Sequence, residues 1–160
     1  MQSGELRRID AGPVPGEAVD GFLVHVAVGT PRPPETLCRV RDVLRVVLSY
    51  LGTSSGEDWA RLLPAWFVSA CSPELTPAEA EAALARWRAD PVAHDADPWS
   101  LSGWLYWFEP ENRSWWWWDG QIEGDDRLGI TIVVEGHPFA DGALRWLLLA
   151  AGAASVAIDD

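Results

Sequence analysis

The chain of 160 residues is 48% hydrophobic and 22% charged, which fits a single soluble domain with a sizeable core. Its formal net charge is −12, and residues 90–160 hold 13 acids against three arginines. This excess disfavours nucleic acid and anionic membranes as partners, because phosphate recognition needs clustered basic residues. It favours a protein partner with a basic surface, although acidity that serves only solubility is the alternative.

The first 20 residues contain Gly, Pro and charged residues without a hydrophobic period. They predict an irregular N-terminal arm, followed by a single domain over residues 21–160. No apolar core of a secretory signal is present in them, so Cys38 and Cys71 fit reduced, buried thiols. The longest nearly apolar run, residues 146–158, is too short to span a bilayer. We therefore expect a cytoplasmic protein.

The first half of the domain predicts one strand followed by helices. Residues 22–28 alternate in the manner of a strand. Residues 35–51 predict a helix, since apolar side chains recur at intervals of three and four: Leu37, Val40, Leu44, Val47 and Leu51. A short helix ends before Pro64, and residues 65–71 fit either a strand or a helix.

A capping box with proline at the first helical position, Thr76-Pro77-Ala78-Glu79, predicts another helix that ends near Ala89. Its apolar face consists of Ala80, Ala83, Leu84 and Trp87.

The second half predicts two aromatic strands over residues 101–109 and 113–119, joined by a tight turn. A strand at 128–135, a helix at 139–151 and a strand at 154–158 follow, an order typical of a right-handed crossover between parallel strands. The expected fold is α+β, with a mixed, mainly antiparallel sheet of about five strands and three to four helices mostly on one face.

Four consecutive tryptophans, Trp115 to Trp118, lie in the second aromatic strand. Alternation predicts that Trp116 and Trp118 complete the core, and that Trp115 and Trp117 lie with Trp107 on the other face. Charged residues bracket that second face, as they would a partly exposed surface. Either other parts of the chain cover it, or it is an aromatic binding patch.

The first functional hypothesis is a small, acidic, non-enzymatic interaction module, with an immunity or antitoxin protein that inhibits a basic toxin as one concrete version. Its candidate binding residues are Trp107, Trp115, Trp117, Glu109, Asp119, Asp125 and Asp126. The second hypothesis is a carbohydrate or small-ligand binder that stacks its ligand on the Trp rings, near Asn112, Asp119 and Gln121.

The third hypothesis is an enzyme that uses Cys71 with His94 or His137 and Asp141, or paired carboxylates as acid and base. No glycine-rich phosphate loop and no zinc-ligand spacing occurs in the sequence, so no cofactor is expected. The acidic stretch that includes Asp125 and Asp126 lacks the alternation of a calcium loop, and a solvated loop explains it better.

Overall fold

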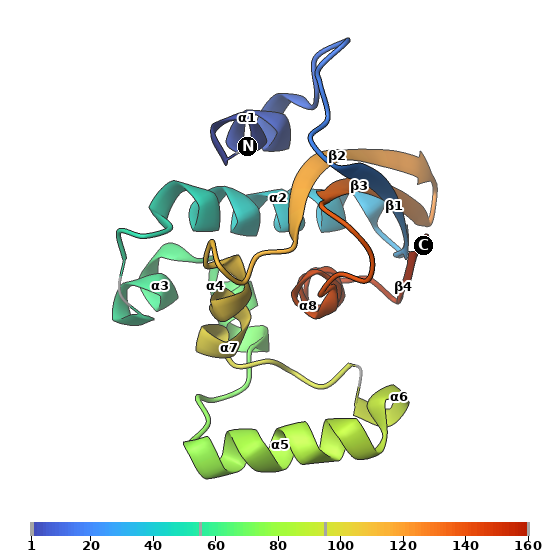
Figure 1. Ribbon diagram of the computed structural model, residues 1–160. Helices are drawn as coiled ribbons and strands as arrows, with labels where there is room; N and C mark the ends of the chain where they lie inside the picture. The colour runs from blue at the N-terminus through green and yellow to red at the C-terminus, as the bar shows by residue number, and fades with distance from the viewer. Residues whose placement is uncertain (1, 55, 95, 160) are drawn as a thin grey trace.

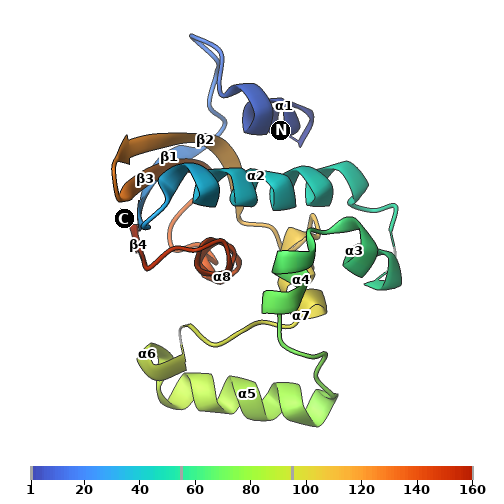
Figure 2. The same ribbon diagram turned by 180° about the vertical axis from the view of Figure 1, so that it is seen from behind.

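The computed structural model describes residues 2–54, 56–94 and 96–159, and Figures 1 and 2 show it from opposite sides. Its centre is an antiparallel sheet in the strand order β2-β3-β1-β4. The strands are β1 (Phe22–Gly29), β2 (Trp115–Gly124), β3 (Arg127–Val134) and β4 (Ser155–Ile158). The α+β class is confirmed. The predicted fifth strand is wrong for the described residues, because residues 101–108 are helical. The predicted crossover does join two parallel strands, since β3 and β4 both run antiparallel to β1, but β1 lies between them and they are not neighbours.

Eight α-helices and one 3-10 helix occur in the part of the chain that the structure describes, more than the three to four predicted. They are α1 (Gln2–Ala11), α2 (Pro33–Tyr50), α3 (Gly56–Leu62), α4 (Ala65–Ala70), α5 (Pro77–Ala89), α6 (Pro91–His94), α7 (Leu101–Leu105), η1 (Tyr106–Phe108) and α8 (Gly142–Ala150). The prediction of an irregular arm is wrong for residues 2–11, since they form α1, which packs against β2 and α2.

One face of the sheet packs against α2 and α8, which lie below it in Figure 1. Alternate residues of β1 and β3 point toward these helices: Val24, Val26, Val28, Leu128, Ile130, Ile132 and Val134. The predicted stripe of α2 meets them through Val40, Leu44 and Val47, all fully buried. The period of 3.6 residues on the helix and of two on the strands therefore locates this core.

A chain of aromatic rings extends the core into α4 and α7. Phe67, Trp104, Phe108 and Trp115 contact one another in that order, at centroid distances of 4.7, 4.5 and 5.6 Å. The Trp104 indole donates a hydrogen bond to the Ala143 carbonyl at 2.9 Å, which ties α7 to α8. These contacts explain why residues 101–108 are helical, because Leu101, Trp104 and Phe108 share one face only at helical spacing.

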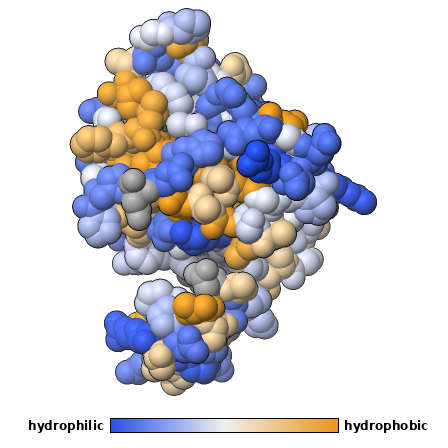
Figure 3. Space-filling view, turned by 90° about the vertical axis from the view of Figure 1, so that its right-hand side faces the viewer, coloured by the Kyte–Doolittle hydropathy of each residue, from blue (hydrophilic) through white to orange (hydrophobic). Residues whose placement is uncertain are grey.

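The helices α5 and α6, residues 77–94, form an arm that projects from the body and makes a separate lobe in Figure 3. Its base is held by a parallel bridge between Ser72 and Ser100, and by Glu74, whose carboxylate accepts hydrogen bonds from the backbone and hydroxyl of Ser102. No residue of α5 is buried, so its predicted apolar face does not join the core. The capping box at Thr76 is confirmed.

None of the helices in the described ranges combines the length and the apolar character that crossing a membrane requires.

Candidate interaction face of the sheet

Three residues of the tryptophan run, Trp115 to Trp117, lie on the opposite faces of the sheet from those predicted. Trp115 and Trp117 pair with Val134 and Ile132 on β3, and they are 2% and 0% exposed on the core side of the sheet. Trp116 lies on the other face and is half-buried. The pairing partner of β2 is β3 rather than residues 101–109, so the apolar face of β3 decides which tryptophans face inward.

Trp118 is buried for a separate reason. The pairing of β2 with β3 shifts between Trp117 and Asp119, so Trp118 is the additional residue of a bulge. Its ring lies 4.8 Å from the guanidinium carbon of Arg8 on α1, a cation–π contact, and it is 9% exposed.

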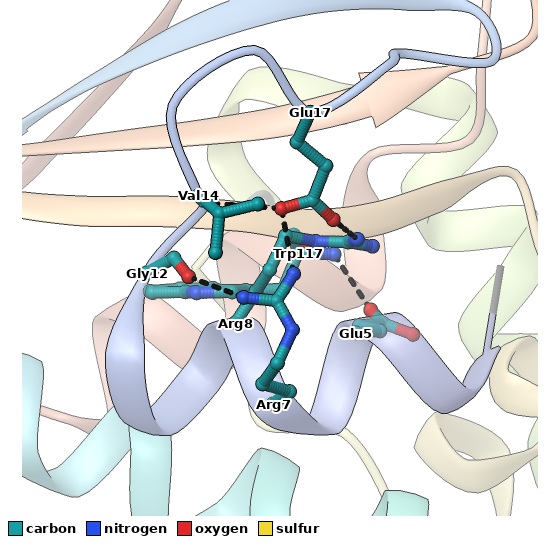
Figure 4. A network of polar contacts seen from close by, with 7 residues as sticks. All are labelled: Glu5, Arg7, Arg8, Gly12, Val14, Glu17 and Trp117. Atoms are coloured by element: carbon teal, nitrogen blue, oxygen red, sulfur yellow. Dashed lines mark hydrogen bonds and ion pairs between the residues drawn. The ribbon is translucent and has the colours of Figure 1, made fainter.

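The free edge of β2 is closed by charged side chains. The Trp117 N–H donates to a Glu5 carboxylate oxygen at 2.6 Å, and Arg8 Nε donates to the Trp117 carbonyl at 3.3 Å (Figure 4). Arg113 Nε donates to the Trp115 carbonyl and Arg41 donates to that of Gly120. Because an unpaired strand edge can recruit another chain, these bonds protect β2 from edge-to-edge pairing.

The carboxylate that receives the Trp117 N–H is itself buried. Glu5 is 0% exposed, and it pairs with Arg113, whose side chain is 4% exposed, at 2.5 Å. Burial raises the pKa of Glu5 in spite of the nearby arginines, and burial lowers the pKa of Arg113. The second Glu5 oxygen is buried without a hydrogen-bond partner among the described residues.

The chain after α1 folds back onto the helix through Glu17. This carboxylate accepts hydrogen bonds from the Val14 N–H, Arg7 and Arg8, as Figure 4 shows. The same three donors, the backbone N–H first, lower the pKa of Glu17 to about 2. Beyond this turn, Gly21 passes so close to the Val134 carbonyl that a Cβ atom at its φ of 134° would clash. The face opposite α2 and α8 is therefore covered at Val133 of β3, which is 2% exposed.

That face has three cross-strand rows, and the part of it that the chain leaves uncovered is called the open face below. A row of apolar residues consists of Leu23, Val133 and Trp116. A central polar row consists of Asp159, His25, Thr131 and Asp119. A row of small residues and Gln121 consists of Ala157, Ala27, Gly129 and Gln121. Among these, Leu23 is 50% exposed, so the apolar row reaches the surface.

His25 is the centre of the polar row. Its Nε2 lies 2.9 Å from a Glu123 oxygen, and its Nδ1 lies 3.3 Å from an Asp159 oxygen. These carboxylates, Glu123 foremost, raise the pKa of His25. The Glu123 side chain reaches His25 by lying over Gly129, where an added Cβ would collide with the carboxylate. His25 therefore connects the β2–β3 hairpin to the end of β4.

The predicted acidic residues divide between two regions. Asp125 and Asp126 are exposed at the β2–β3 turn, and Asp119 is half-buried in the polar row, with a hydrogen bond from the Gln121 amide at 2.9 Å. Glu109 is exposed at the opposite end of β2, after η1. The structure therefore brings together Asp119, Asp125 and Asp126 along one strand and its turn, and leaves Glu109 apart from them.

The predicted aromatic site is not available as a surface. Trp115 and Trp117 belong to the core, and Trp107 is half-buried against it, with its ring edge-on to Tyr106 at 5.4 Å. The stacking platform that a carbohydrate would need is thus absent from these three residues. Sequence reasoning missed His25 and Glu123, whose only signal is their position on the outward side of two strands.

The thiol site is not assembled either. Burial raises the pKa of Cys71, which disfavours the thiolate that a nucleophile needs. His94 pairs with Asp97, while the ring of His137 lies between those of Phe22 and Phe139. Cys38, predicted to be buried, is exposed. Within the described ranges, no three His, Cys, Asp or Glu side chains gather as a metal site would require.

Comparison with protein-family models, with curated proteins and with solved structures finds no match to this chain.

Proposed function

We propose that this protein is a non-enzymatic interaction module, and that the open face of its sheet binds a protein partner with a basic surface. The main observation is that carboxylates line a sheet face that α2 and α8 leave free. Asp119 and Asp159 belong to the polar row, and Glu123 lies over it. Asp125 and Asp126 extend the negative charge around the β2–β3 turn.

The open face also has the apolar component that protein interfaces use. Leu23 on the apolar row is half-exposed. Interfaces typically bury a few apolar anchors at the centre and surround them with polar and charged residues. Leu23 with neighbouring carboxylates matches that pattern on a small scale.

The shape of the face favours a protein over a small ligand. Small-molecule sites are concave, whereas the row with Ala157, Ala27 and Gly129 has short or no side chains on a sheet. A cavity of about 350 Å³ lies elsewhere, between α1, α2 and Ile122. One concrete form of the proposal is an immunity or antitoxin protein, because a nuclease-like toxin must present a cationic surface to its substrate.

The test is affinity capture from native lysate with wild type and two matched charge-reversal variants. Asp125→Arg/Asp126→Arg changes the open face, and Glu109→Arg/Glu111→Arg makes the same charge change at the other end of β2. All four positions are exposed, so both variants are expected to fold. We expect a basic protein to be captured by wild type and by the second variant, and to be lost from the first.

Raising the salt concentration should weaken the same capture, because exposed charges are screened. Equal capture by both variants would contradict a role for the open face. Capture that is insensitive to salt, or of proteins without a basic surface, would contradict the proposed partner.

A further inference from the structure

The arm presents a helix surface that the body does not use. α5 has no buried residue, although 13 residues are near the lower limit for a helix that is stable without packing. Its apolar stripe contains Ala80, Ala83, Leu84 and Trp87, and the last two are 45% and 47% exposed. A stripe at this spacing is typical of a helix that packs against another helix.

The charges beside the stripe are arranged in two mixed pairs. At 100° per residue, Glu79 and Arg86 flank the stripe on one side, and Glu81 and Arg88 flank it on the other. Each side therefore has its acid toward the start of the helix and its arginine toward the end. No ion pair joins Glu81, Arg86 or Arg88 to another residue in the ranges that the structure describes.

We propose that the stripe of α5 binds the same stripe of a second copy of this chain, with the two helices antiparallel. This goes beyond the proposed function, since it concerns the arm and not the open face. In the register centred between Ala83 and Leu84, Trp87 of each copy lies opposite Ala80 of the other, and Leu84 opposite Ala83. Large side chains thus meet small ones across the pair, as close packing between helices requires.

The flanking charges favour the antiparallel arrangement. A two-fold axis perpendicular to the helices places each side next to the same side of the other copy, so Glu79 meets Arg86 and Glu81 meets Arg88. A parallel pair would instead place Glu79 beside Glu81 and Arg86 beside Arg88. Like charges in such positions are destabilising. A single helix pair buries less than the roughly 1,200–2,000 Å² of stable interfaces, so the dimer should form at micromolar or higher concentration.

The test is sedimentation of the full chain over about 5–500 μM, with circular dichroism to confirm folding of each variant. Wild type should dimerise, and Trp87→Ala should not. Glu81→Arg alone and Arg88→Glu alone should each weaken the dimer about tenfold, since each creates two like-charge contacts. The double exchange Glu81→Arg/Arg88→Glu should restore it, and an equimolar mixture of the single variants should form a heterodimer.

A monomer at every concentration would overturn the proposal. So would a dimer that both single variants leave unchanged, or one that either single variant strengthens, because the latter is the result expected of parallel helices.

Discussion

Replacing Arg113 with methionine is expected to lower the free energy of unfolding by about 3–5 kcal/mol, the usual cost of removing one partner from a buried ion pair. Arg113 pairs with the buried Glu5 carboxylate and also donates to the Trp115 carbonyl. Its loss leaves a charge with one oxygen already unpartnered in the core. Urea denaturation followed by circular dichroism measures the change.

Arg127→Met provides the control, because the Arg127 side chain is exposed at the start of β3 and its loss should change stability by about 0.5 kcal/mol or less. In the Arg113→Met background, Glu5→Gln removes the unpaired buried charge and should therefore recover part of the lost free energy of unfolding. If Arg113→Met costs no more than Arg127→Met, the Glu5 pair is not buried as described.

The loss of unfolding free energy caused by Arg113→Met should also depend on pH. A carboxyl group whose folded-state pKa is raised stabilises the fold below its unfolded pKa, and this stability is lost as pH rises through the folded pKa. Burial raises the pKa of Glu5 in wild type, and removal of Arg113 raises it further. The difference between variant and wild type should therefore grow as the pH rises through the folded-state pKa of Glu5 in wild type toward its higher pKa in the variant.

Trp117→Ala is expected to cost about 3–5 kcal/mol, and Trp116→Ala about 1–2 kcal/mol. Trp117 is 0% exposed and contacts the core, so its removal leaves a cavity as well as losing apolar burial. Trp116 is half-buried on the other face, where its ring lies 5.7 Å from the Arg113 guanidinium. The same denaturation measurement compares these neighbouring substitutions of identical size.

The alternation inferred from the sequence predicts the reverse order, with Trp116 the more costly to remove. A larger loss for Trp116→Ala would therefore support the outward orientation of Trp117 and contradict the structure.

The elements with a single strong period were predictable. The stripe over residues 35–51 corresponds to α2 (Pro33–Tyr50), and the strand predicted at 128–135 corresponds to β3 (Arg127–Val134). In both, local spacing and the tertiary core favour the same face. The capping box at Thr76 likewise located α5, because its hydrogen bonds are local.

Residues 101–109 were mispredicted because their aromatic residues fit two periods at once. Trp104, Tyr106 and Phe108 alternate as in a strand, but Leu101, Trp104 and Phe108 share a helix face, and the Ser100 side chain caps α7. Once these residues are helical, β2 pairs with β3 and the faces of the Trp run are exchanged. The hydrophobic period alone does not distinguish a helix from a strand here, because tertiary packing decides between them.

Nothing in the sequence indicated that residues 2–11 form a helix that closes the free edge of β2. Glu5 and Arg8 are charged residues in a segment with Gly and few apolar side chains, yet both are buried against β2. Their burial depends on Trp117 and Arg113, more than 100 positions away in the chain. The polar row of the open face could not be predicted for the same reason, since His25 meets Glu123 and Asp159 only after the strands pair.

In this structure Trp115 and Trp117 face inward and α1 closes the free edge of β2, which leaves the opposite face of the sheet for binding. The exchange rate of the Trp117 backbone amide with deuterium tests it most directly, since this N–H points away from β3 and donates to Glu5. We expect slow exchange, comparable with that of amides in the central strands, and faster exchange in Glu5→Ala. Rapid exchange of the Trp117 amide in the wild-type protein would show that the edge of β2 is open and that α1 does not close it.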